Sequence, residues 1–236
     1  MGHVRTGFLP RTKQWNAIVK QLSLFGDNAD VVPRIAHDTL TAIKKTYAGM
    51  PSDESVRKAV VFLATLAFSA KQADQVTYLK ANGYQIDDKL SLFSLVSSAQ
   101  QFIKTETGSL EINKIAKDAA MQAVIKYHEA HKNNQLQLWG EAKSPIQSAG
   151  SGAAFCELAR SFFAIFTDKQ IKYYVERAAA SAINDYSELN KFTNALSAQT
   201  NAIADHAFET SKIMQSFAAG WFNKHAVSSP SAAPRF

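Results

Sequence analysis

Residues that restrain or interrupt a chain are scarce in this sequence. Its 236 residues include one cysteine, Cys156, 10 glycines and 6 prolines. A single thiol cannot form an intrachain disulfide or a cysteine-based zinc finger, and it is typical of a reducing compartment. No glycine lies between Gly152 and Gly220, and no proline lies between Pro145 and Pro230, so nothing in that span has to end a helix. Strand-like alternation is confined to residues 136–139, and we predict an all-α fold.

Long hydrophobic runs are also missing. The longest apolar run, residues 59–70, has 12 residues, whereas a membrane-spanning helix needs about 20. We interpret it as a buried core helix. The first 15 residues are charged and have no apolar segment of the kind that secretory signals carry. Together with the single cysteine, this predicts a cytoplasmic protein without a transmembrane segment.

The common motifs of catalysis and nucleotide binding do not occur. The sequence has no G-x-x-x-x-G-K-[ST] loop, no G-x-G-x-x-G loop and no G-x-S-x-G motif. His128 and His131 are three residues apart on a predicted helix, which is not the spacing of zinc proteases, and a helix C-terminus favours cationic side chains in any case. We therefore assign no catalytic residue, no cofactor and no metal ligand.

Helical periodicity extends over most of the chain. Helices are expected at residues 12–25, 30–47, 52–82, 87–104 and 110–132. We divide the chain into a basic N-terminal arm with the first helix (1–26), an N-terminal helical region (27–132), a linker or flap (133–152), a C-terminal helical region (153–227) and a flexible tail (228–236). The architecture expected is a multi-helix bundle with a long C-terminal helix.

The stretch 152–184 organises the C-terminal region. Apolar residues repeat at helical spacing over 155–166, and again over 171–182. Between these repeats, Thr167 and Gln170 have the form of a capping box, which predicts that a new helix starts at Thr167. The stretch would then be a packed helical hairpin. A further helix from Asp185 could extend for about 40 residues, or roughly 60 Å.

Charged pairs lie in this predicted hairpin beside large aromatic residues, and they are Glu157 with Arg160 and Glu176 with Arg177. One reading is a polar centre for a phosphate or carboxylate, because arginine binds such groups through two parallel hydrogen bonds. The other is a structural network that links two helices. Convergence of the four side chains in one pocket would favour the first reading.

Positive charge is concentrated at the N-terminus. Four basic residues precede the first acid, Asp27, although the whole chain carries a net charge of +6. Cations interleaved with aromatic rings suit contact with nucleic-acid phosphates and bases or with a protein groove. The candidate contact residues are Arg5, Phe8, Arg11, Lys13, Trp15 and Lys20. Alternatively, Phe8 and Trp15 anchor the arm to the core while the cations stay in solvent.

The central aromatic and charged segments, residues 155–160, 162–163, 166–167 and 173–177, resemble a segment of uncharacterised helical bacterial proteins encoded in multi-gene phage-defence operons. The start of the chain, residues 5–12, shares this likeness. The resemblance implies a non-enzymatic subunit that works beside a nuclease, helicase or ATPase.

These observations lead to a functional hypothesis with alternatives. We expect an accessory or adaptor subunit that binds a protein partner, with nucleic acid as a further ligand of the basic arm. An enzyme of an unrecognised helical class, with the Glu/Arg polar centre as its site, is the alternative. A homo-oligomeric structural protein built on the C-terminal helix is a further one.

Overall fold

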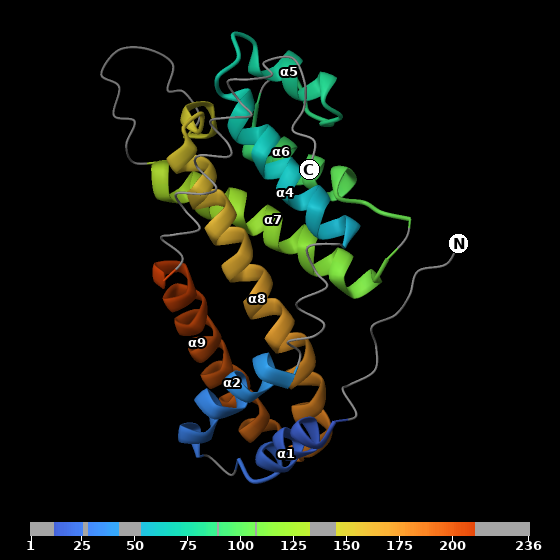
Figure 1. Cartoon of the computed structure of the whole chain (residues 1–236), viewed down its shortest axis with the longest axis vertical. Coiled ribbons are helices and arrows are strands. Elements are labelled where there is room, and N and C mark those ends of the chain that lie inside the picture. Colours follow the sequence, from blue (N-terminus) through green and yellow to red (C-terminus); the bar gives the residue numbers. More distant parts are fainter. Residues whose placement is uncertain are drawn as a thin grey trace.

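Helices are the regular elements of the described part of the chain, which in this computed structural model comprises residues 12–25, 28–42, 53–88, 90–106, 108–132 and 145–210. Figure 1 shows their arrangement. They are α1 (Lys13–Leu22), η1 (Ala29–Val31), α2 (Val32–Ala42), α4 (Glu54–Ser69), α5 (Gln75–Ala81), α6 (Leu92–Phe102), α7 (Leu110–His131), η4 (Pro145–Ser148), α8 (Gly152–Ala182) and α9 (Tyr186–Thr210). The predicted all-α multi-helix bundle is confirmed. None of these helices is long and apolar enough to cross a lipid bilayer.

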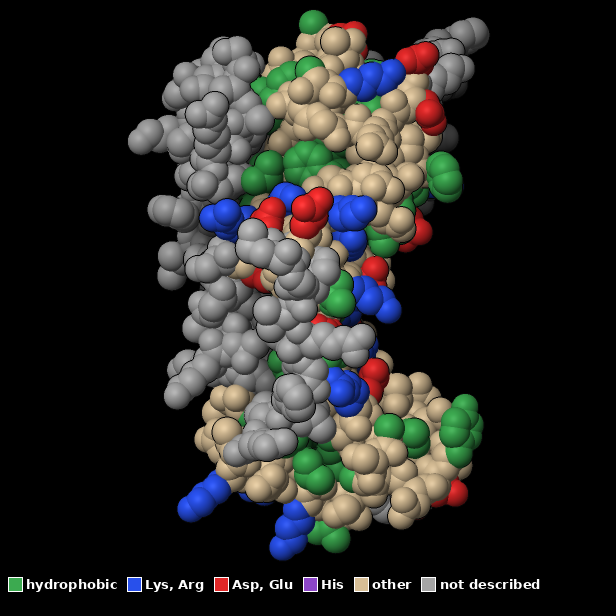
Figure 2. Space-filling model, turned by 90° about the vertical axis from the view of Figure 1, so that its right-hand side faces the viewer, with side chains coloured by type: hydrophobic (Ala, Val, Ile, Leu, Met, Phe, Trp, Pro, Cys, Tyr) green, Lys and Arg blue, Asp and Glu red, His purple; other side chains and the backbone are tan. Residues whose placement is uncertain are grey.

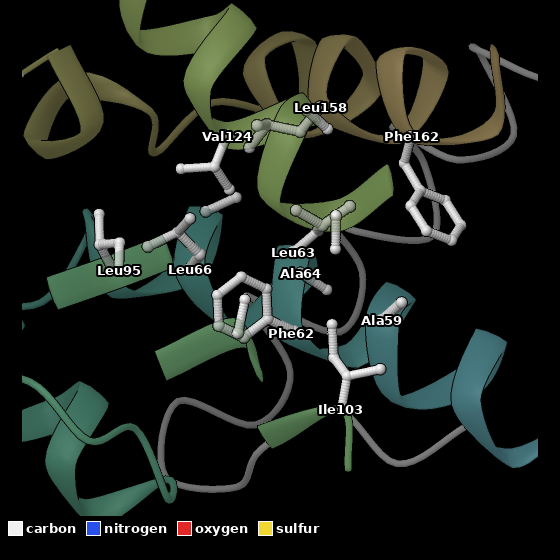
Figure 3. Packing of buried hydrophobic residues seen from close by; sticks show 14 of the residues in the cluster. Ala59, Phe62, Leu63, Ala64, Leu66, Leu95, Ile103, Val124, Leu158 and Phe162 are labelled. Carbon is white, nitrogen blue, oxygen red and sulfur yellow. The ribbon is translucent and has the colours of Figure 1, made fainter. Parts of the chain in front are cut away.

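Two hydrophobic cores lie at different heights along α8. The first core joins α4, α5, α6 and α7 to the N-terminal half of α8. Figure 3 shows part of it, where Leu66 of α4 lies next to Val124 of α7, with Leu158 of α8 above them. The second core joins α1, α2 and α9 to the C-terminal half of α8. Residues near the start of the chain therefore pack against residues near its described end (Figure 1).

A single helix of 31 residues, α8, connects the two cores. The predicted hairpin with a new start at Thr167 is therefore wrong. The proposed capping residues instead lie inside the helix, where Gln170 is 2% exposed and Asp168 binds side chains of α8 and α9. With neither glycine nor proline between residues 153 and 182, nothing interrupts the backbone hydrogen bonds.

The apolar stripe of α8 changes direction where the hairpin was expected. At about 100° per residue, Phe155 and Phe162 point into the first core on one face of the helix, whereas Ile171 and Val175 point into the second core on a face roughly 160° away. This change of phase resembles a helix boundary in sequence. In the structure, two nearly opposite faces of α8 pack into the two cores.

Polar side chains fix the start of α7 against α4 and the end of α6. The buried Asn113 side chain donates hydrogen bonds to the Ser55 hydroxyl at 3.1 Å, the Ile103 carbonyl at 2.9 Å and the Thr105 hydroxyl at 3.0 Å. Buried amide groups need such partners, because water cannot reach them. The network therefore sets the direction in which the first turns of α7 leave the core.

Other helix limits also differ from expectation. The helix expected over 52–82 is divided into α4 and α5, because Asp74 accepts hydrogen bonds from Thr77 and so caps a new helix. In the expected linker, residues 133–144 lie outside the described part, whereas Ile146 and Ala149 are buried in the first core. The domain limits stay a prediction. The long C-terminal helix is present as α9, and the part expected beyond Thr210, with the tail, lies outside the described residues.

Proline scanning tests the continuity of α8. Replacing Thr167 by proline should reduce the free energy of unfolding by about 3 kcal/mol, because a proline inside a helix removes a backbone hydrogen bond and clashes with the preceding turn. Urea denaturation followed by circular dichroism measures this. The control is Tyr186→Pro at the exposed first position of α9, where proline is tolerated and the change should be small. Equal stability of both variants would place a helix boundary at Thr167.

Candidate functional site

A concave surface with a volume of about 770 Å³ opens between the start of α7 and the C-terminal half of α8. We call it the waist groove. It lies where the molecule narrows between its two cores, and Figure 2 shows acidic and basic side chains gathered at this level. The residues that line it are Glu111, Lys114, Ile115 and Asp118 of α7, and Asp168, Lys169, Lys172, Tyr173, Glu176 and Arg177 of α8.

The α8 wall of the groove continues the stripe that fills the first core. From Phe162 and Phe166, steps of three and four residues lead to Lys169, Tyr173 and Glu176, which therefore lie on nearly the same face of the helix. The face is apolar where it meets the first core, and it becomes charged below that core. The groove thus forms because α7 and α8 cross and diverge while the stripe changes from phenylalanine to charged residues.

Several of the groove charges neutralise one another. Asp168, with a side chain 14% exposed, pairs with Lys172 at 2.8 Å and accepts a hydrogen bond from the buried Thr200 hydroxyl of α9. Lys169 approaches Asp118 across the groove at 3.9 Å. Asp168 therefore ties α9 to α8, and Lys169 links α8 to α7.

An aromatic and cationic ladder borders the lower end of the groove. The Arg177 guanidinium donates a hydrogen bond to the Tyr173 hydroxyl at 2.8 Å and lies 5.3 Å from the centre of that ring. Tyr173 contacts Tyr174 edge to face, with ring centres 5.3 Å apart. Tyr174 in turn packs against Trp15 of α1, at 6.2 Å. Through this ladder, the groove is continuous with the packing of α1.

Glu176 differs from the other acids of the groove. Its carboxylate is partly buried and makes no hydrogen bond or ion pair with any other described residue. Burial raises the pKa of the Glu176 carboxyl, the neighbouring Asp168 adds to this, and Lys172 and Lys169 oppose it in part. A carboxylate kept in a concavity without a partner is unfavourable for folding and is typical of a functional site.

The other charged pair of the sequence analysis lies elsewhere on α8. Glu157 faces His131 of α7, with 3.5 Å between carboxylate and ring nitrogen. The other ring nitrogen of His131 donates to the Tyr127 carbonyl at 2.8 Å, and the ring stacks on that tyrosine. This arrangement holds the crossing of α7 and α8.

The structure does not bring the Glu157/Arg160 and Glu176/Arg177 pairs together. Because α8 is continuous, the 16 residues from Arg160 to Glu176 span about 24 Å at 1.5 Å per residue. Glu176 and Arg177 line the waist groove, whereas Glu157 and Arg160 do not. A single polar centre made of all four side chains is not formed.

Part of the predicted contact arm lies in α1. Trp15 is 3% exposed in the second core, so its ring offers no face to a nucleic-acid base. Lys13 and Lys20 are exposed and are seven residues apart, which places them on one outer face of the helix. Arg5, Phe8 and Arg11 lie outside the described residues.

In the described part of the chain, neither clustered metal ligands nor an exposed thiol is found. No group of three or more His, Cys, Asp or Glu side chains there could hold a metal ion. Cys156 is 1% exposed, and burial raises the pKa of its thiol, which disfavours the reactive thiolate.

Asp118, Asp168 and Lys172, which line the groove with Glu176, and Thr200, which binds Asp168, were not among the predicted site residues. A signal was present in the continuation of the α8 stripe beyond Phe166, where charged residues take apolar positions. The facing residues of α7 and α9 follow only from the packing of the helices.

Comparisons with known proteins give no relative: no protein-family model, no curated protein sequence and no solved structure matches this chain. The resemblance to helical proteins of phage-defence operons stays a hypothesis.

The raised pKa of Glu176 predicts a pH-dependent stability effect. When a carboxyl group has a higher pKa in the folded protein than in the unfolded chain, the free energy of unfolding falls as the pH rises from the unfolded pKa to the folded pKa. Glu176→Gln should therefore stabilise the protein at neutral pH, by less than about 1 kcal/mol at this solvent-screened position, and should have little effect in acid. Thermal melts between pH 4 and pH 8 measure it.

The matched control is Glu129→Gln, which removes the same charge from an exposed site near the end of α7. A stabilisation of equal size in both variants would show that net charge, and not the environment of Glu176, is responsible.

Proposed function

We propose that this chain is a non-enzymatic, cytoplasmic adaptor or accessory subunit that binds a protein partner, with nucleic acid as a further ligand of its basic N-terminal arm. The helical body would hold the contact segments in place, with α8 as the connecting element between the two cores. The resemblance to proteins of phage-defence operons suggests a bacterial multi-subunit complex as the setting.

The distribution of charge carries this proposal. Of the 26 Lys and Arg residues, nine lie outside the described residues, whereas only two of the 20 Asp and Glu residues do. The described part therefore holds 17 cations and 18 anions, a net charge of −1, although the whole chain carries +6. The positive excess therefore comes from residues outside the described part, with Arg5 and Arg11 of the arm among them, and positive charge attracts anionic surfaces over a distance of several ångströms.

The outer face of α1 supports the same interpretation. Lys13 and Lys20 point away from the second core and extend the positive charge of Arg5 and Arg11 onto a helix that Trp15 fixes in place. A ligand held by Lys13 and Lys20 would have a defined position relative to α8, because α1 packs on α8.

An enzyme remains the second candidate, and Glu176 is the observation that favours it. A half-buried carboxyl with a raised pKa suits general acid or base catalysis. The separation of Glu157 and Arg160 from the groove leaves Glu176 and Arg177 as the only members of the predicted polar centre that could act there. This is a smaller constellation than the enzyme hypothesis expected.

Charge reversal tests nucleic-acid binding by the arm. The triple variant Arg5→Glu, Arg11→Glu, Lys13→Glu should weaken binding to single-stranded DNA or RNA by at least about tenfold and reduce the slope of log K against log salt by roughly two to three, because about one counterion is released per phosphate contact. Fluorescence anisotropy over a salt series measures both quantities.

The control for net charge is the triple variant Lys126→Glu, Lys132→Glu, Lys191→Glu, in which the replaced residues are exposed on α7 and α9 or next to them. An equal loss in this control would remove the arm from the proposal, and absence of binding by the unmodified protein at low salt would remove nucleic acid. Affinity capture from the native host would identify the protein partner. The mass in solution would show whether a second copy is among the partners.

A further inference from the structure

We propose that the waist groove binds a basic side chain, lysine or arginine, of a protein partner, and that the Glu176 carboxylate receives it. This rests on the proposed function in one respect, that the partner is a protein. It adds which surface of the body takes part and which chemistry the partner presents. Binding of nucleic acid by the N-terminal arm is independent of it.

Three of the four acids that line the groove already have a partner. Asp168 is occupied by Lys172 and Thr200, Asp118 faces Lys169, and Glu111 accepts a hydrogen bond from the Ser109 hydroxyl at 3.0 Å. Glu176 makes no such contact with any described residue. The groove therefore has one acid whose charge is left without a direct partner within the described part of the chain.

Three of the four cations that line the groove are engaged with groups other than Glu176. Lys169 and Lys172 are engaged with Asp118 and Asp168, and Arg177 is hydrogen-bonded to and stacked on Tyr173. Lys114 is exposed to water and makes no ion pair within 4 Å with a described acid, so its solvated charge need not be neutralised. An incoming cation is thus the group that would satisfy Glu176.

The groove has room for a side chain of a partner. Its volume of about 770 Å³ far exceeds what one lysine or arginine side chain fills. A side chain that enters the groove leaves water and meets a partly buried carboxylate, where a charge-assisted hydrogen bond is stronger than on an open surface. In the free protein the raised pKa of Glu176 reflects the free-energy cost of keeping a charge at this partly buried position.

The probe for this proposal is N-acetyl-arginine amide, which carries the side chain without terminal charges. It is titrated to millimolar concentration against the full chain, and methyl NMR signals are recorded. Ile115 lines the groove and reports binding, whereas Ile35, fully buried in the second core, serves as an internal reference. Saturable shifts of Ile115 without shifts of Ile35 are expected, together with a fall in the pKa of Glu176 on its carboxyl carbon signal, because the probe binds the ionised form.

Variants then assign the binding to the carboxylate. Glu176→Gln should raise the dissociation constant of the probe by about tenfold, Glu176→Asp should retain most of the affinity, and Glu129→Gln should behave like the unmodified protein. N-acetyl-glutamine amide and N-acetyl-glutamate amide should not shift Ile115. Absence of a shift with the arginine probe, equal binding by the glutamine variant, or equal shifts with the glutamate probe would each overturn the proposal.

The groove experiments and the arm experiments test the two proposals separately. If the groove binds the probe while the arm variants leave nucleic-acid binding unchanged, the groove proposal stands and the role of the arm fails. If the arm variants have their effect and the groove does not bind the probe, the adaptor proposal stands without this surface.

Discussion

The uninterrupted backbone of α8 is the constraint on which the rest of the structure depends. Its 31 residues face one core with Phe155 and Phe162 and the other core with Ile171 and Val175, on nearly opposite sides. A helix is stiff along its axis, so the two cores are held at a set distance and a set rotation. The N-terminal helices α1 and α2 can then meet the C-terminal α9 around the C-terminal half of α8, although they lie far from it in the sequence.

The waist groove is a consequence of the same geometry. Where α8 leaves the first core, the face that carried phenylalanines is no longer covered, and apolar residues there would be exposed to water at a cost of about 25 cal/mol per Å². Lys169, Tyr173 and Glu176 occupy these positions. Asp168 also accepts a hydrogen bond from Thr200, which joins the groove wall to α9.

Sequence patterns were sufficient for the helical class and for most helix positions, because periodicity and caps act over a few residues. They failed at Thr167, where a capping motif and a change of phase coincide inside a helix; the packing of both sides outweighs the local preference of one threonine. Similarly, Asp74 divides α4 from α5 by a capping interaction that the apolar run concealed. The sequence predicted only some of the residues of the candidate site. Glu176 and Arg177 stood out as charges among aromatics, but Asp118, which lines the same groove from α7, is about 60 residues away in sequence, at a distance where only tertiary packing decides contact.

The balance of charges distinguishes the groove from an ordinary polar surface. On an exposed helix face, oppositely charged residues three or four positions apart contribute a few tenths of a kcal/mol and need no further explanation. Lys172 and Asp168 have that spacing and form an ion pair, whereas Glu176, four residues after Lys172, does not, because Lys172 is already turned toward Asp168. Stability alone would favour an uncharged residue at position 176. Within the described part of the chain, Glu176 is the groove acid without a direct partner, and the proposed binding of a basic side chain would give it one.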